Sequence, residues 1–297
     1  MSNVLLLIVI SAFAGGSNAP LAKIALESFQ PFTVIFIRFL TAALLLLPLM
    51  RKHNELKRSS FKELFWVAAI GSLNPILLFI GLQFTLASVS PLIYASVPLM
   101  TTIYVHRFRG RKITSDKILG IVLGFTGVAI IILLPFFQQG IFDWSSIGGN
   151  LLIFAAATAF MFYGILSNDK QRQYQISPLA LTYYFVLATL ALSIPFALYE
   201  ISSQPLELGA IRPAHLLSAL GTGLIGTSLF YLAYQRAIQL GNELTASLFT
   251  YLQPVATISL SVLLLGEAIT LPFVVGGALA VIGAGMATVG NNKNGRG

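Results

Sequence analysis

The chain alternates between long apolar runs and short breaks rich in glycine, proline or charge along its whole length. Each run has about 20 residues, which as a helix is enough to cross a hydrocarbon core of about 30 Å. The pattern predicts ten membrane-spanning helices, at residues 3–25, 31–50, 63–85, 88–106, 117–136, 148–168, 178–199, 214–238, 244–265 and 271–290. We therefore expect an all-α membrane protein. Its first run, which contains residues 4–14, is interpreted as a retained span because no basic residue precedes it as in a signal peptide.

The composition excludes an ordinary soluble domain. Of the 297 residues, 56% are hydrophobic and only 9% are charged, and a soluble domain cannot bury that much apolar surface. The net charge of +8 raises the question of nucleic acid, but the basic residues crowd into two short loops, near 51–62 and 107–117. Neither loop belongs to a folded basic surface that could follow a phosphate backbone. We expect the lipid bilayer as a partner and no nucleic acid.

The basic residues also predict an orientation. When both termini are placed in the cytoplasm, fifteen of the 18 Lys and Arg residues fall in cytoplasmic loops or the C-terminal tail, and two fall on the other side. Lys and Arg are enriched in cytoplasmic loops, so this imbalance supports both the orientation and an even number of spans. We expect a multi-pass protein of a plasma membrane, the bacterial inner membrane, with both termini cytoplasmic.

Two gapless alignments of the chain with itself indicate an internal repeat. An offset of 156 residues pairs Pro98 with Pro254 and Gly110 with Gly266, and an offset of 147 pairs Pro31 with Pro178. The first half, 1–137, and the second half, 148–290, then hold five spans each. Because five is odd, the two halves must have opposite orientations in the membrane, the arrangement of inverted-repeat transporters.

Several short motifs together resemble the drug/metabolite transporter superfamily. They are Gly16-Ser17-Asn18 with Lys23, Pro31 with Arg38, the region of Pro98, and the run from Leu265 to Thr270. The resemblance covers essentially the whole chain and is specific to the ten-span members built from two EamA-type domains. One departure is that Gly15-Gly16 stands where the family usually has Trp-Gly. The resemblance implies alternating access between two five-helix bundles, with export of amino acids or related small metabolites as the commonest role.

Arg38 is a charged residue inside a predicted span. It follows Pro31 by about seven residues, so at 1.5 Å per residue it lies roughly 10 Å into the membrane. A charge at that depth costs at least about 3 kcal/mol unless it faces a partner or a wet cavity, so Arg38 should point into the helix bundle. One interpretation is that it binds a substrate carboxylate or gives the cavity a positive potential. The alternative is that it holds the backbone carbonyls of a neighbouring helix and is structural.

Polar and aromatic residues within the spans are the other candidates for a substrate cavity. The candidates beside Arg38 are Asn18, Asn74, Tyr94, Tyr163, Tyr231, Tyr251 and Gln253. Amide side chains are unfavourable in lipid and should face inward. Pro75, Pro98 and Pro254 are candidate helix breaks or hinges, because proline frees a backbone carbonyl at membrane depth and broken helices often line transport sites. The alternative is that the prolines only improve packing and that the tyrosines belong to the interfacial belt.

Glycine patterns in the spans predict close helix packing. Residues 221–226 spell GxGxxG, but this motif signals dinucleotide binding only after a strand, and here it lies inside a span. Gly120 and Gly124 and their repeat partners Gly276 and Ala280 form a second small-residue pattern of the kind that lets helix backbones approach. A lipid-embedded dimer face is one use for it. We expect a monomer or a weak homodimer.

The remaining candidate chemistry is sparse. Glu243 and Glu267 lie at the ends of the span 244–265, where capping and ion pairing explain them, and no acidic residue lies in the middle of a span. There is no cysteine and no HExxH or GxSxG motif, so we expect no catalytic residues, no metal site and no cofactor. Drug transport and sugar or nucleotide-sugar transport remain open alternatives. For an intramembrane enzyme, the chain lacks a set of catalytic residues. For a scaffold without transport, it lacks a soluble docking domain.

Overall fold

The computed structural model describes residues 2–52, 61–110, 113–140, 142–203 and 211–289, so parts of the two basic loops and the C-terminal tail lie outside it. Within these ranges the chain forms helices and no strand. The helices of the first half are α1 (Ser2–Gly16), α2 (Asn18–Leu26), α3 (Pro31–Lys52), α4 (Phe61–Leu82), α5 (Val89–Tyr94), α6 (Ser96–Arg109), α7 (Ser115–Ile132) and α8 (Leu134–Gln139). The second half contains α9 (Trp144–Tyr174), α10 (Pro178–Ser203), α11 (Pro213–Gly223), the π-helix η3 (Leu224–Leu229), α12 (Phe230–Leu240), α13 (Glu243–Ser247), α14 (Phe249–Leu265) and α15 (Leu271–Val289).

The predicted membrane fold is confirmed. Among the described residues, nine helical runs are long and apolar enough to cross a membrane, and they correspond to nine of the ten predicted spans. The tenth, predicted at 88–106, is divided into α5 and α6 at Ala95. Neither helix alone has the length of a span, although the two together do.

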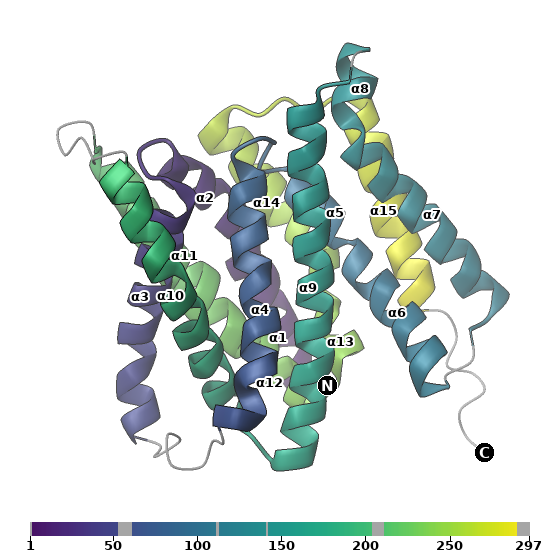
Figure 1. Ribbon diagram of the computed structural model, residues 1–297. Helices are drawn as coiled ribbons and strands as arrows, with labels where there is room; N and C mark the ends of the chain where they lie inside the picture. The colour runs from purple at the N-terminus through teal and green to yellow at the C-terminus, as the bar shows by residue number, and fades with distance from the viewer. Residues whose placement is uncertain (1, 53–60, 111–112, 141, 204–210, 290–297) are drawn as a thin grey trace.

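The spans run up and down between two ends of the molecule (Figure 1). We call the end at which α1 begins and α15 ends the terminal face, and the other end the opposite face. The first span of the first half starts at the terminal face, whereas α9, the first span of the second half, starts at the opposite face. The two halves are therefore inverted relative to each other, as an odd number of spans in each half requires.

The main helix contacts join the two halves. α7 packs along α15, α4 packs along α9, and α3 packs along α10 (Figure 1). Glycines allow the closest of these approaches, because a Cβ at Gly120 would lie 2.6 Å from the backbone nitrogen of Ala287. Gly124 and Gly283 meet through their backbones in the same interface. The glycines that the sequence offered as a dimer face are thus already occupied within one chain.

Three spans are interrupted rather than continuous. α1 meets α2 at Ser17, α5 meets α6 at Ala95, and α13 meets α14 at Leu248. Of the candidate hinge residues, Pro98 lies in the first turn of α6, close to its break, and Pro254 lies in the second turn of α14. By contrast, Pro75 lies inside α4, which continues through it.

The ends of α6 and α14 show the repeat at the level of the backbone. Gly110 follows α6 with φ of 68° and Gly266 follows α14 with φ of 66°. Both are left-handed residues that end a helix, a conformation that glycine adopts without strain. The offset of 156 residues that pairs them in the sequence therefore also relates their positions in the fold.

Candidate functional site

A small cavity lies between the two halves, and both halves contribute to its wall. The lining residues are Gly15, Asn18, Ala19, Arg38, Asn74, Leu78, Ser90, Tyr94, Phe160, Phe230, Tyr231, Phe249 and Gln253. Six of the eight candidate cavity residues from the sequence are among them. The space open to the centre of a water molecule is about 30 Å³, which is room for no more than a few waters. We call this space the central cavity.

Arg38 lies on α3 and is 1% exposed, the most deeply buried charge in the described part of the chain. Its Nε donates to the hydroxyl of Thr227 at 2.6 Å, and Nη2 donates to the carbonyl of Gly226 at 3.1 Å. The guanidinium also lies 5.2 Å from the ring centre of Phe39 and 5.1 Å from that of Phe79. These contacts match the structural interpretation of Arg38 and fix the direction of its side chain.

The third nitrogen of the same guanidinium has a different environment. Nη1 is buried and has no hydrogen-bond partner among the described residues. Arg38 lines the central cavity, and no acidic side chain does. A buried donor on a cation without a counter-ion is unfavourable, so this group suits an anionic partner that enters the cavity.

Asn74 joins the two halves in the wall of the central cavity. Its amide nitrogen donates to the hydroxyl of Tyr94 and, at 2.9 Å, to the carbonyl of Ala156. Its amide oxygen accepts from the hydroxyl of Tyr231 at 3.1 Å. Tyr94 comes from the first half, whereas Ala156 and Tyr231 come from the second. This buried amide therefore holds both tyrosines in place and ties α4 and α5 to α9 and α12.

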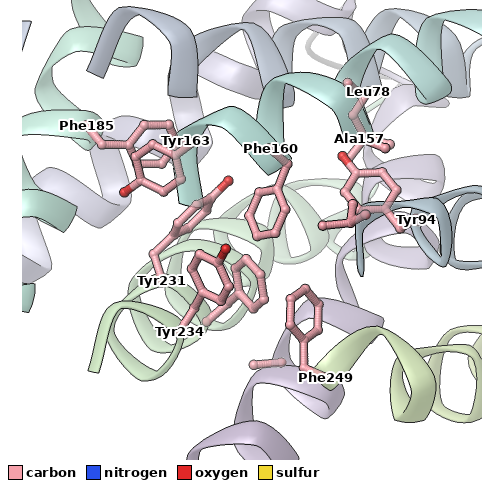
Figure 2. Close-up of a cluster of buried hydrophobic side chains, with 14 of the residues drawn as sticks. Leu78, Tyr94, Ala157, Phe160, Tyr163, Phe185, Tyr231, Tyr234 and Phe249 are labelled. Carbon is pink, nitrogen blue, oxygen red and sulfur yellow. The ribbon is translucent and has the colours of Figure 1, made fainter. Parts of the chain in front are cut away.

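Aromatic rings form the apolar wall (Figure 2). Phe160 on α9 lies in the middle, with its ring centre 4.8 Å from that of Tyr234 and 5.9 Å from that of Phe249. Tyr163 and Tyr231 lie on one side of it and Tyr94 lies on the other. The cavity thus combines a polar end with an aromatic end, a common design for sites that bind small organic molecules.

Two amide groups complete the polar end. Asn18 follows the break between α1 and α2, and Gln253 lies on α14 one turn beyond Phe249. The oxygens Asn18 Oδ1 and Gln253 Oε1 are buried and have no hydrogen-bond donor among the described residues. Two residues that line the central cavity therefore carry unpartnered acceptors, and Arg38 carries an unpartnered donor. That combination matches a ligand that carries both an anionic and a cationic group.

The structure places the other two candidate residues outside this cavity. Tyr163 is buried behind the wall, where its ring contacts Tyr231 at 5.9 Å between ring centres. Tyr251 faces α15, and its hydroxyl contacts the carbonyl of Ala284 at 2.6 Å and the hydroxyl of Thr288 at 2.5 Å. Tyr251 thus joins α14 to α15.

Sequence reasoning missed seven lining residues, and helical spacing could have found three of them. Residues four apart lie on one face of a helix. By that rule Leu78 follows from Asn74, Ser90 from Tyr94, and Phe249 from Gln253. The four that remain are Gly15, Ala19, Phe160 and Phe230. In a chain with 22 phenylalanines, nothing in the sequence marks Phe160 or Phe230.

Polar side chains close the bundle at the terminal face. Arg109, at the end of α6, donates to Glu243 at 2.8 Å and to Asp169 at 2.7 Å. Deeper in the bundle, the amide of Gln171 donates to the side chain of Gln235 at 2.7 Å. The Arg109 contacts link the first half to the second. The ion-pairing role expected for Glu243 is confirmed.

At the opposite face the carboxylate of Glu267 links the same two spans. Glu267 follows α14, and its two oxygens accept hydrogen bonds from the backbone N–H of Ala87 at 2.7 Å and of Ser88 at 2.9 Å. These N–H groups precede α5, where a helix start favours negative charge. The capping role expected for Glu267 is therefore also confirmed.

The site can now be set beside known proteins. A model of the EamA-like transporter family matches residues 2–133 and again residues 147–289. The chain belongs to the EamA-like transporter family. It is accordingly a multi-pass membrane transporter, and the resemblance noted from its motifs is confirmed.

Relatives of this EamA-family transporter extend over nearly the whole chain. An uncharacterized transporter from Clostridium kluyveri is 25% identical over 272 residues, which are 89% of this chain and 85% of that protein. The uncharacterized transporter YyaM from Bacillus subtilis is 27% identical over a region that is 90% of this chain and 88% of that protein. A protein of known crystal structure is 21% identical, with a TM-score of 0.67, over 97% of this chain and 98% of that one. This last likeness supports the fold.

Proposed function

We propose that this transporter exports amino acids or related small metabolites that carry a carboxylate, by alternating access between its two halves. The observation that carries the proposal is the unpartnered Nη1 of Arg38 in a cavity without an acidic side chain. An amino acid supplies a carboxylate for this donor and an ammonium for the free oxygens of Asn18 and Gln253. The terminal face would lie in the cytoplasm, in agreement with the distribution of basic residues.

The small volume of the central cavity fits one stage of such a cycle. Both faces are linked across the two halves by polar contacts, and the space between them is about 30 Å³. A substrate larger than a few waters requires the halves to move apart at one face. The small closed cavity therefore supports a conformation between the two open ones in the proposed cycle.

Efflux from liposomes tests the proposal directly. The purified protein is reconstituted in liposomes loaded with a mixed pool of radiolabelled amino acids, and release is followed for wild type, Arg38→Ala and Arg38→Lys. We expect saturable release of a subset, reduced about tenfold or more in Arg38→Ala, because a charge-assisted hydrogen bond contributes about 1.5–3 kcal/mol. Release should be partly retained in Arg38→Lys, which keeps the charge without the planar guanidinium.

A second variant separates recognition from packing. Thr227→Val removes the acceptor of Arg38 Nε and leaves the guanidinium in place. If Arg38 only holds helices together, Thr227→Val and Arg38→Ala should both reduce release and thermal stability to a similar degree. If Arg38 binds the substrate, Arg38→Ala should lose far more release than stability. Absence of amino-acid release above empty liposomes, with saturable release of sugars or of cationic drugs, would contradict the proposal.

A further inference from the structure

A second and larger cavity lies next to the central cavity, toward the opposite face. It is about 290 Å³ in volume and is lined by Lys23, Gln83, Phe84, Thr85, Leu86, Val89, Leu134, Pro135, Gln138, Ser146 and Asn150. The two cavities share walls. α5 contributes Val89 to this one and Ser90 to the central one, and α2 contributes Lys23 here and Asn18 there. We call the larger cavity the Lys23 pocket.

Lys23 is the charged side chain of this pocket, and it is not neutralised by a direct contact. The ammonium is partly buried and makes no hydrogen bond or ion pair with a described residue. Glu267 attracts it electrostatically, but both oxygens of Glu267 already accept backbone hydrogen bonds from Ala87 and Ser88. A partly buried cation without a close counter-ion attracts small anions into the space that it lines.

Half of the remaining lining residues are polar, and hydrogen bonds hold several of them in place. Thr85 donates to Asn150 at 2.5 Å, and Asn150 donates to the carbonyl of Ile132 at 2.9 Å. Gln138 donates to the hydroxyl of Thr270 at 2.8 Å. These bonds fix the walls, while the second lone pair of each amide oxygen can still accept from an N–H or O–H group of a ligand. The pocket is thus preformed and offers hydrogen bonds beside a positive charge.

One acid lies at the rim of the pocket. The carboxylate of Asp143 accepts from the hydroxyl of Ser146 at 2.6 Å and caps the start of α9. Hydrogen bonds from the hydroxyl and backbone of Ser146 and from the backbone of Ser145 hold the pKa of Asp143 below its usual range, so it is ionised at neutral pH. Asp143 is partly exposed, so water screens its charge.

The residue at the repeat-related position of the terminal face has a different environment. Lys170, the partner of Lys23 at an offset of 147 residues, stacks on Tyr174 with its nitrogen 4.7 Å from the ring centre. The space beside it is crossed by the contacts of Arg109 with Asp169 and Glu243. The Lys23 pocket therefore adjoins the central cavity on the side of the opposite face.

We propose that the Lys23 pocket is a second binding site, at which the carboxylate of the transported solute pauses between the central cavity and the opposite face. This inference rests on the proposed function, because it concerns the same solute. It adds a second cationic binding residue, Lys23, on the exit side of the central cavity.

The absence of cysteine from the chain makes the local charge measurable without knowing the solute. Gln83→Cys places a thiol at an exposed position of the pocket. The reaction rate of this thiol is measured in proteoliposomes with two reagents, the anionic sulfonatoethyl methanethiosulfonate and the cationic trimethylammonioethyl methanethiosulfonate. Each rate is divided by the rate of the same reagent with a free thiol. We expect the anionic reagent to be favoured, and Lys23→Gln to lower the anion-to-cation ratio about tenfold. Lys23→Arg is the matched control that should preserve it.

Transport kinetics complete the test and separate the two proposals. For an amino acid that wild type releases, Lys23→Gln should raise the KM for uptake from the opposite face about fivefold, with the maximal rate little changed, and Lys23→Arg should not. An unchanged rate ratio or an unchanged KM in Lys23→Gln would overturn this inference and leave amino-acid export standing. A charge-dependent ratio in a protein that releases no amino acid would overturn the proposed function and support an anion site for another solute.

Discussion

The fourth and ninth spans meet twice, once at each face of the molecule. At the terminal face, Arg109 at the end of α6 binds Glu243 at the start of α13. At the opposite face, Glu267 after α14 binds the backbone N–H groups of Ala87 and Ser88 before α5. The repeat offset of 156 residues relates these sites, since it carries Ala87 to Glu243. The repeat thus preserves the position of the junction while the residues that form it have diverged.

Because of this difference in chemistry, the two junctions should respond differently to side-chain substitutions and to salt. The opposite-face junction depends on one side chain, that of Glu267, because its partners are backbone N–H groups, which side-chain truncation does not remove. The terminal-face junction depends on three side chains, one of which, Asp169, is 49% exposed and open to screening by salt. If the halves separate alternately, each face should respond to its own residues. Three substitutions test this, with Ser90→Cys in the central cavity as a reporter in the cysteine-free chain.

Glu267→Ala should have the largest effect. It leaves two buried backbone N–H groups without an acceptor, which costs about 3 kcal/mol. We expect Ser90→Cys to react much faster with an impermeant maleimide applied from the opposite face, and the thermal unfolding midpoint in detergent to fall. Glu267→Gln, which retains one acceptor oxygen, should lie between Glu267→Ala and wild type. Equal labelling of Glu267→Ala and wild type would show that this contact does not close the opposite face.

Arg109→Gln should have the next largest effect, on the other face. It leaves Glu243, whose side chain is 7% exposed, without its ion-pair partner, a loss of about 2 kcal/mol. We expect faster labelling of Ser90→Cys from the terminal face in inside-out vesicles and no gain from the opposite face. The double variant Arg109→Gln with Glu243→Gln no longer has an unpaired charge. Its effect on labelling should therefore be smaller than the sum of the effects of the two single variants.

Asp169→Asn should have the smallest effect. Its carboxylate is about half exposed, and such pairs contribute about 0.2–1 kcal/mol. We expect labelling from the terminal face to rise by no more than about threefold at low salt, and the difference from wild type to vanish at high salt. A large effect that persists at high salt would indicate that Asp169, and not Glu243, is the main partner of Arg109.

The fold was predictable because its signals are local. A span needs about 20 apolar residues, and a charge outside a protein cavity is excluded from the membrane, so hydropathy and loop charge locate the helices. The break at Ala95 was harder to predict, because α5 and α6 both lie within one continuous apolar run. The repeat was visible because glycines such as Gly110 and Gly266 mark backbone conformations that other residues adopt only with strain.

The candidate site was predictable only in part, because facing a cavity depends on the rotation of each helix about its axis. Tyr251 and Gln253 illustrate the limit. They are two residues apart on α14, so their side chains point about 200° apart and cannot face the same cavity. The helical period excludes one of the two, but the sequence does not say which. Packing against α15 decides it, because Tyr251 bonds Ala284 and Thr288 there.

By itself the sequence determined the helical membrane fold, the inverted halves and the presence of a buried arginine, all of which follow from local composition and spacing. Only the tertiary structure decided what Arg38 does with its three nitrogens. Two are held by Gly226 and Thr227 from the other half, and one is left free at the central cavity. The physical reason is that partners 188 and 189 residues away come together only when the halves pack. Free hydrogen-bonding capacity in a buried group is a property of that packing.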